Sequence, residues 1–323
     1  MLKGLALTPP VIGRIAIGKV VEKNGRRIPE KDDEFTITSQ VQNKDGWVVH
    51  PVDEQLRKQE PGAKLRGIPV QLLFDDPDLS LRANYTMFDR ATGRPLCVGD
   101  GERCKRITLA GMQGLACPGP AICPLGQEGH CKPYARLHVR IDTGEPGDDD
   151  LGSFVFRTTG FNSIRTLSAR LRYYKAVSGG LLAGLPLQLR LRGKSTALSH
   201  RTPIYYLDLT LRKGVSLAAA VTAAKEQRSQ MAAAGLDQQA LDEAARCALA
   251  LGEFEESPEE GVDVVEEFYP ELDSQGPGRK DAGGSGDSGP GASGAAALRT
   301  KLVRKLQAGT GVTGDPGGDH AGA

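Results

Sequence analysis

The chain is 323 residues long, with 39% hydrophobic residues and with 41 Lys and Arg set against 40 Asp and Glu. No apolar run approaches the roughly 18 residues that a membrane span needs, and two prolines interrupt the start MLKGLALTPPVIG, so we expect neither a membrane span nor a signal peptide. We therefore expect a soluble, cytoplasmic protein, and in that compartment clustered cysteines are more often metal ligands or free thiols than disulfides.

Most of the chain before residue 213 carries strand patterns. Short runs that alternate apolar and polar residues, separated by turn residues, predict strands in this order: 12–21, 34–39, 47–49, 68–74, 84–89, 135–142, 154–160, 187–192 and 203–212. In the run ARLHVRID the apolar residues Leu137, Val139 and Ile141 are expected to face the core, and His138 the solvent.

A single helix interrupts these strands after residue 160. Asn162 or Ser163 can cap its start. Its apolar face repeats at helical spacing: Ile164, Leu167, Leu171 and Tyr174. Because strands and helices do not alternate, the pattern predicts an α+β domain over residues 1–213 rather than a doubly wound sheet.

The composition changes at Ser216. Residues 216–235 and 236–252 read as two Ala-rich helices, the first ended by Gly235 and the second capped by Asp237. We expect them to form an antiparallel helical hairpin within 214–252. An acidic segment follows (253–274), and the tail (275–323), dominated by Gly, Ala, Ser and Pro, has too little apolar surface to order itself and is expected to be disordered.

Charge is distributed unevenly along this plan. Residues 132–213 hold fourteen Lys and Arg against six Asp and Glu, whereas residues 214–274 hold three against fourteen. The basic part favours an anionic partner, and the acidic part favours a basic partner or self-shielding of the chain. Two solvated surfaces would give the same pattern.

Five of the six cysteines lie within residues 97–131, which we expect to form a zinc knuckle: Cys97, Cys104, Cys117, Cys123 and Cys131. Glycines and prolines after Cys117 and Cys123 supply the tight turns that bring zinc ligands together. The spacing fits no standard zinc-ribbon template, and an iron–sulfur cluster is the alternative. The sixth, Cys247, lies in an Ala-rich helix, where a buried small residue is the simplest interpretation.

Cys117, Cys123 and Cys131 are the strongest candidate ligands, and the fourth is Cys97 or Cys104. The basic neighbours of Cys104 lower the pKa of a thiol and favour it. All-cysteine zinc sites are usually structural, and the sequence has no HExxH motif, nucleophile elbow, P-loop or Rossmann fingerprint. Nothing therefore demands an enzyme, and a metal-dependent hydrolase of nuclease or phosphatase type is the alternative interpretation.

Several segments, taken in order, resemble one family. They are IGRIAIGKVV…RRIPEKDDEFTITS, LCVGDGERCKR, CPGPAICPLGQEGHCKPYARLHVRI, FVFRTTGFNSIRTLSARL and GGLLAGLPLQLRLR. Over residues 11–212 the chain resembles the phage recombination directionality factors that partner large serine integrases, and relatives carried on integrative conjugative elements. The resemblance favours Cys97 as the fourth ligand, because Leu-Cys-x-Gly-Asp-Gly recurs in that family.

The resemblance implies a protein that performs no bond chemistry, in a bacterial or phage-infected cell. Such a factor binds the integrase on its attachment-site DNA and shifts it from joining sites toward excising them. No small-molecule substrate is expected, and direct DNA binding without an integrase is a third interpretation. Five arginines are candidate contacts to DNA or integrase: Arg157, Arg165, Arg172, Arg190 and Arg192.

Overall fold

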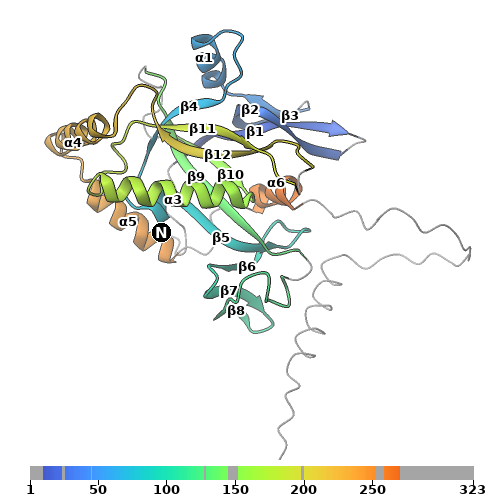
Figure 1. Ribbon diagram of the computed structural model, residues 1–323. Helices are drawn as coiled ribbons and strands as arrows, with labels where there is room; N and C mark the ends of the chain where they lie inside the picture. The colour runs from blue at the N-terminus through green and yellow to red at the C-terminus, as the bar shows by residue number, and fades with distance from the viewer. Residues whose placement is uncertain are drawn as a thin grey trace, which may run out of the picture.

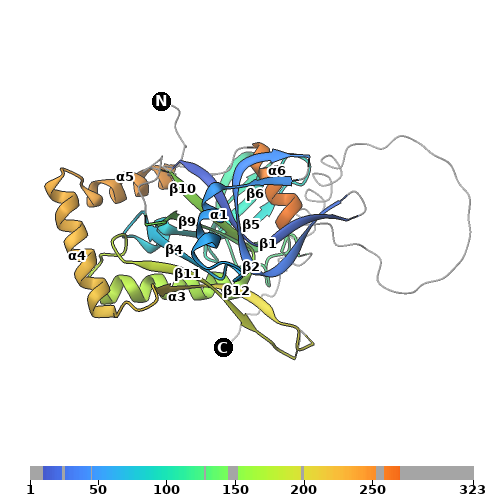
Figure 2. The same cartoon turned by 90° about the horizontal axis from the view of Figure 1, so that it is seen from above.

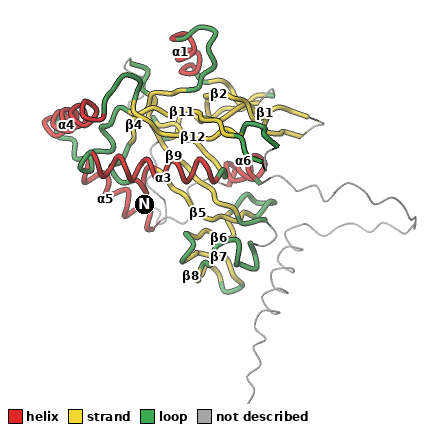
Figure 3. Tube along the Cα trace, viewed as in Figure 1, coloured by secondary structure: helices red, strands yellow, loops and turns green. Residues whose placement is uncertain are grey.

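The computed structural model describes residues 10–23, 26–44, 46–126, 129–144, 152–197, 200–251 and 258–269 (Figures 1 and 3). The strands are β1 (Val11–Lys23), β2 (Arg26–Asn43), β3 (Gly46–Val49), β4 (Gly67–Leu72), β5 (Leu81–Phe88), β6 (Pro95–Gly99), β7 (Arg103–Thr108), β8 (Gly111–Ala116), β9 (Lys132–Ile141), β10 (Ser153–Thr158), β11 (Leu187–Lys194) and β12 (Ile204–Leu211). The helices are α1 (Pro51–Gln59), α2 (Pro77–Ser80), α3 (Phe161–Val177), α4 (Leu217–Ala233), α5 (Gln238–Leu251) and α6 (Pro258–Phe268).

The described strands form one 12-stranded sheet, which confirms the predicted strand-rich α+β architecture. Its main path runs β3-β2-β1-β10-β9-β5-β6-β7-β8. Strand β9 is central, because one of its edges pairs with β10 and the other is shared between β5 and β4. Strand β4 pairs in turn with β11, and β11 with β12. The end of the path, β6 to β8, projects away from the rest of the sheet (Figure 1).

The main core lies between the sheet and α3. Alternation in β9 places Leu137 and Val139 on this face, where they are fully buried with Leu167 and Leu171 of α3. The helix begins at Phe161 with Gly160 as its N-cap, so the expected cap at Asn162 or Ser163 is wrong. Ser163 has another role, because its hydroxyl accepts a hydrogen bond from the Leu207 amide of β12 at 3.0 Å.

His138 does not face solvent, contrary to the prediction. It lies on the face of β9 opposite Leu137 and is 4% exposed. The pattern of β9 resembled a half-buried strand because its second face is made of basic residues. That face is covered by other elements of the chain, a tertiary effect that alternation within one strand does not reveal.

The two Ala-rich helices form where they were expected, but they do not lie side by side. Helix α4 packs Ala220 and Ala224 into the main core, whereas α5 packs Ala245 against Phe74 and Leu79 beside α2. The helices point in different directions (Figure 2), so the expected antiparallel packing is not seen. Cys247 is exposed on α5, and the expectation that it is buried is wrong.

Part of the acidic segment forms α6, which packs against the sheet on the side opposite α3 (Figure 2). The tail expected to be disordered, 275–323, lies outside the described residues. Among the helices that the structure describes, none is long and apolar enough to cross a membrane.

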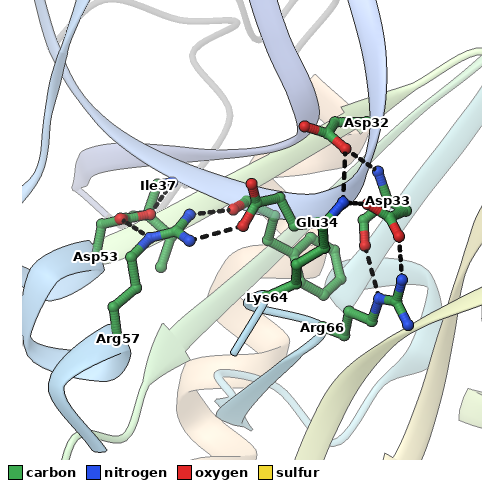
Figure 4. Close-up of polar contacts among 9 residues, drawn as sticks. Asp32, Asp33, Glu34, Ile37, Asp53, Arg57, Lys64 and Arg66 are labelled. Atoms are coloured by element: carbon green, nitrogen blue, oxygen red, sulfur yellow. Dashed lines mark hydrogen bonds and ion pairs between the residues drawn. The ribbon is translucent and has the colours of Figure 1, made fainter. Parts of the chain in front are cut away.

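Figure 4 shows the polar contacts that attach α1 to β2. The buried Asp53 carboxylate accepts a hydrogen bond from the Ile37 amide at 2.9 Å and another from Arg57 Nε at 2.6 Å. Arg57 also pairs with Glu34 at 2.7 Å. Next to this group, Asp33 pairs with two cations: Lys64 and Arg66.

Candidate metal centre and basic surfaces

The cysteine segment is built on the projecting strands. Cys97 lies on β6 and Cys104 on β7, and the antiparallel register sets Cys104 opposite Gly99. Cys117 follows β8, and its amide donates to the Glu102 carbonyl at 2.9 Å, which ties the start of the loop to the β6–β7 turn. The Cys123 amide then bonds back to the Gly119 carbonyl at 2.9 Å, in a turn that uses the positive φ of Gly119.

These strands and turns bring the cysteines into one small cluster. Cys97, Cys104 and Cys117 are buried together with Met87, and the partly buried Cys131 packs against them. Cys123 is also buried, and Arg106 joins it to the others. The Arg106 guanidinium lies 3.4 Å from Cys97 Sγ through Nε and 3.6 Å from Cys123 Sγ through Nη2.

Gly99 makes this close approach possible. A Cβ at position 99 would lie 2.8 Å from both Cys104 Cβ and Cys117 Sγ. Real Cβ contacts are not that short, so any side chain here would push the two cysteines apart. The first glycine after Cys97 in LCVGDG is therefore a packing requirement of the cluster.

Burial and the proximity of other cysteines favour the protonated thiol at two members of the cluster, Cys131 and Cys104. Burial raises the pKa of Cys131 to about 12, with smaller contributions from Cys97, Cys123 and Cys117. It also raises the pKa of Cys104 to about 11, with contributions from Cys97 and Cys117. A bound divalent cation has the opposite effect, because it stabilises the thiolates that coordinate it.

The donor set fits a zinc ion in its chemistry, since buried, clustered cysteines are the preferred ligands of structural zinc. Within the described ranges, however, no group of three or more His, Cys, Asp and Glu side chains is arranged to hold a metal ion. The structure thus brings the predicted cysteines together without converging their sulfur atoms on one point.

Two functional residues of this cluster were not found from the sequence. Arg106 was not predicted as a member of the site, although its guanidinium contacts Cys97, directly across from it in the β6–β7 pair, and Cys123. The packing role of Gly99 was not predicted either. Finding Arg106 requires the strand register, because no motif in the sequence connects it with Cys97 or Cys123.

The five predicted arginines do not form a single surface. Arg165 and Arg172 are exposed on the outer face of α3, and Arg190 is exposed on β11. Arg192 pairs with the buried Asp208 at 3.2 Å, a carboxylate that also binds Arg170 at 3.0 Å.

Arg157 is the exception among the five, because its side chain is only 8% exposed and pairs with Glu260 of α6 at 3.1 Å. It is covered by α6 as the chain is folded, and it belongs to a different face of the sheet from the outer surface of α3.

A cavity of about 640 Å³ lies beside β5, between this strand, α3 and the β6–β7 pair. Four cationic side chains line it, together with Tyr134 and Phe88: Arg82, Arg136, Arg172 and Lys105. Two carboxylates, those of Asp78 and Asp100, also line it. The excess of cations suits an anionic ligand.

Comparison with known proteins gives one result for this chain. No curated protein and no solved structure matches it significantly. A family model described as Gp3-like, recombination directionality factor-like, matches residues 12–212. This range is more than half of the 323 residues and includes the described strands from the second residue of β1 onward, the cysteine cluster and α3, but it ends before α4. The chain therefore belongs to the recombination directionality factor-like family.

Proposed function

We propose that this protein is a zinc-stabilised accessory factor for site-specific DNA recombination, which binds a large serine integrase on its attachment-site DNA and favours excision over joining. The observation that carries the proposal is the family match over residues 12–212. The proposal places the protein in the cytoplasm of a bacterial or phage-infected cell, and it requires no reaction at the factor itself.

Such a factor acts by differential binding. It favours excision only if it binds the excising integrase complex more tightly than the joining complex, and each tenfold difference in affinity shifts the balance by about 1.4 kcal/mol. A rigid body with a defined protein-binding surface is what this mechanism needs.

The outer face of α3 is the surface that we assign to the integrase. Phe161 is 60% exposed and lies one helical turn before the exposed Arg165, and Tyr173 is 53% exposed and follows the exposed Arg172. Exposed aromatic residues beside arginines are the composition that is enriched where proteins bind one another most strongly. The inner face of α3 is fixed in the main core, so this surface is held rigidly.

We assign the zinc ion to Cys97, Cys117, Cys123 and Cys131. The electrostatic neighbours of Cys131 support this set, because Cys97, Cys123 and Cys117 all raise the pKa of its thiol. The Cys104 sulfur lies against the Ala116 carbonyl at 3.8 Å. When bound, the metal supplies a cross-link between β6 and the loop that joins β8 to β9, and Arg106 offsets part of the negative charge of the thiolates.

The experiment combines metal analysis with a recombination assay that uses a large serine integrase from the same genome and its paired attachment sites. We expect the wild-type protein to contain one zinc ion per chain and to promote excision between paired attachment sites. Cys117→Ser is expected to lose zinc and activity. Cys247→Ser, which changes an exposed cysteine on α5, is the matched control and is expected to retain both.

The two parts of the proposal fail separately. A chain that promotes excision without bound zinc would refute the metal assignment and leave the recombination function standing, and bound iron with visible absorbance would assign an iron–sulfur cluster in its place. A zinc-loaded chain that leaves the balance between excision and joining unchanged would refute the directionality function.

A further inference from the structure

Four arginines form a row on one face of the central sheet. They come from four neighbouring strands in the order β1, β10, β9 and β5: Arg14, Arg157, Arg136 and Arg82. The register sets Arg136 directly opposite both Arg157 and Arg82, and Arg14 opposite Val155, two residues from Arg157. Because side chains alternate along a strand, this row faces away from the main core.

Helix α6 covers this row. Glu267 pairs with Arg14 at 2.8 Å, and Glu260 pairs with Arg157 at 3.1 Å. Asp263 lies on the same side of the helix and accepts a hydrogen bond from Gln42 of β2 at 3.3 Å. The carboxylates that face the sheet are therefore repeated along one side of α6, at sequence spacings of three and four residues.

Helix α6 also makes apolar contacts with the sheet, beside its ion pairs. Val264, Val265 and Tyr269 are buried against Phe88 of β5 and Tyr134 of β9. The Tyr269 hydroxyl also donates to the Thr86 carbonyl at 3.2 Å. The occupant of this face is thus an acidic helix with a narrow apolar side.

The docked position of α6 depends on a close contact between two backbone segments. A Cβ at Gly261 of α6 would lie 2.1 Å from the Gly93 carbonyl oxygen, and a Cβ at Gly93 would lie 2.3 Å from the Val262 amide nitrogen. Both clashes are with backbone atoms, which cannot move aside as a flexible side chain can. The docked position of α6 therefore requires glycine at both positions.

The ion pairs contribute little net attraction between α6 and the sheet. Burial raises the pKa of the Glu267 carboxyl above its usual value, even though Arg14 and Arg157 oppose the shift. Burial likewise lowers the pKa of the Arg14 guanidinium. Removing both charges from water offsets much of their attraction, so buried ion pairs often contribute no net stability. An isolated helix as short as α6 is also marginal in water.

The covered face has the chemistry of a polyanion site with stacking positions. The Arg14 guanidinium lies 4.1 Å from the Trp47 ring, and that of Arg136 lies 5.3 Å from the Tyr134 ring. Arginines interleaved with aromatic rings bind the phosphates and bases of nucleic acids. The row also extends to the 640 Å³ cavity, which Arg82 and Arg136 line together with Lys105 of β7.

We propose that this arginine face binds the phosphodiester backbone of a nucleic acid, and that α6 is an intramolecular acidic cover that occupies the face until nucleic acid displaces it. All four arginines lie within the family match, residues 12–212, whereas α6 lies outside it. The site is distinct from the protein-binding role assigned to α3. It gives the protein a direct contact with DNA, and α6 inhibits that contact until DNA displaces it.

Gly261→Ala tests the proposal without changing the charge of the chain. Alanine favours a free helix by about 1 kcal/mol relative to glycine, yet its methyl group clashes with Gly93 when the helix is docked. The matched control is Val262→Ala, at the adjacent and 38% exposed position. Binding of fluorescent oligothymidylate and of duplex DNA, each about 20 residues long, is measured with the full chain at two salt concentrations.

If α6 is docked in at least nine of ten molecules, its release strengthens nucleic-acid binding by about tenfold or more. We expect Gly261→Ala to show this gain, Val262→Ala to match the wild type, and added Arg14→Gln to reverse the gain. Hydrogen exchange is expected to show faster exchange in α6 and unchanged protection in β9 and β10. The single-stranded and duplex probes distinguish which form of backbone the face accepts.

Three results would overturn the proposal. Equal nucleic-acid binding by Gly261→Ala and the wild type, with α6 released, would show that the face does not bind this ligand. A gain that persists with Arg14→Gln would place binding elsewhere. Binding of a synthetic acidic peptide of residues 258–269, but of neither nucleic acid, would identify the face as a docking site for an acidic protein helix.

Discussion

At the scale of single residues, His138 is the most unusual side chain of the sheet. It is buried on β9 near Arg82, Arg136 and Arg157, and neither ring nitrogen has a hydrogen-bond partner within the described part of the chain. Burial lowers the pKa of its imidazole, the three arginines add to this effect, and together they bring the pKa to about 3. The folded protein therefore holds a neutral imidazole in a positively charged environment.

This environment predicts acid sensitivity. The unfolded chain binds a proton on His138 near its ordinary pKa of 6.5, whereas the folded chain does so only near 3. Stability is thus complete above pH 6.5 and falls as the pH decreases from 6.5 toward 3, by about 1.4 kcal/mol per pH unit. Between pH 6.5 and 5 we expect the wild type to lose about 2 kcal/mol that His138→Leu does not lose.

Urea unfolding at the two pH values measures this difference. At pH 7 we expect His138→Leu to be about as stable as the wild type, because the substitution removes two buried nitrogen atoms that have no hydrogen-bond partner among the described residues. His200→Asn, at an exposed histidine in a left-handed conformation that Asn tolerates, is the control and should keep the wild-type pH dependence. Parallel pH profiles for His138→Leu and the wild type would contradict the assignment.

At the scale of elements, α1 is held to the sheet by polar contacts more than by its apolar surface. Leu56 is its buried apolar residue, whereas Asp53 satisfies the Ile37 amide of β2 and the Arg57 side chain at once. Asp53→Ala would leave a buried amide and a guanidinium without this acceptor, which costs roughly 3 kcal/mol.

Chemical denaturation of Asp53→Ala measures this cost directly. Glu54→Ala, one residue away and exposed in the same helical turn, is the control, and we expect it to stay within about 0.5 kcal/mol of the wild type. A loss of similar size in both variants would show that helix propensity, rather than the contact with β2, determines the effect.

The sequence predicted elements well where periodicity alone fixes them. Leu167, Leu171 and Tyr174 of α3 are buried as their spacing indicated, and the strands 68–74 and 187–192 form close to their expected bounds. The start of α3 was misplaced because Ser163 serves a neighbouring strand instead of its own helix. Likewise, the packing of α4 and α5 depends on separate tertiary contacts, with the core for Ala224 and with Phe74 for Ala245.

The candidate site was predictable only in part, for the same reason. The density of cysteines indicated a cluster, and the structure brings Cys97, Cys104 and Cys117 together. The arginine row was not predictable, because Arg14 and Arg157 are distant in sequence and meet only through the parallel pairing of β1 with β10. The acidic segment was recognised by composition, but its position over this row requires the complete fold.

At the scale of the whole molecule, the cysteine cluster is separate from the main core. The main core joins α3, α4 and most of the sheet, and it includes none of the cysteines. The cluster instead includes Met87 of β5. It is attached to the rest of the sheet by the pairing of β5 with β6 and by Cys131, the residue before β9. Its strands β6 to β8 therefore depend on local interactions for their order.

This separation predicts a local response to metal removal. On the zinc proposal, a chelator should abolish hydrogen-exchange protection in β7 and β8, because five cysteines, Met87 and a few apolar neighbours bury too little surface to hold three short strands. Protection in β10 and α3 should remain, since their contacts lie in the main core. Cys247→Ser should respond as the wild type does. Loss of protection throughout the sheet would instead show that β9 transmits the loss of the cluster to the core, and unchanged protection everywhere would mean that no metal holds these strands.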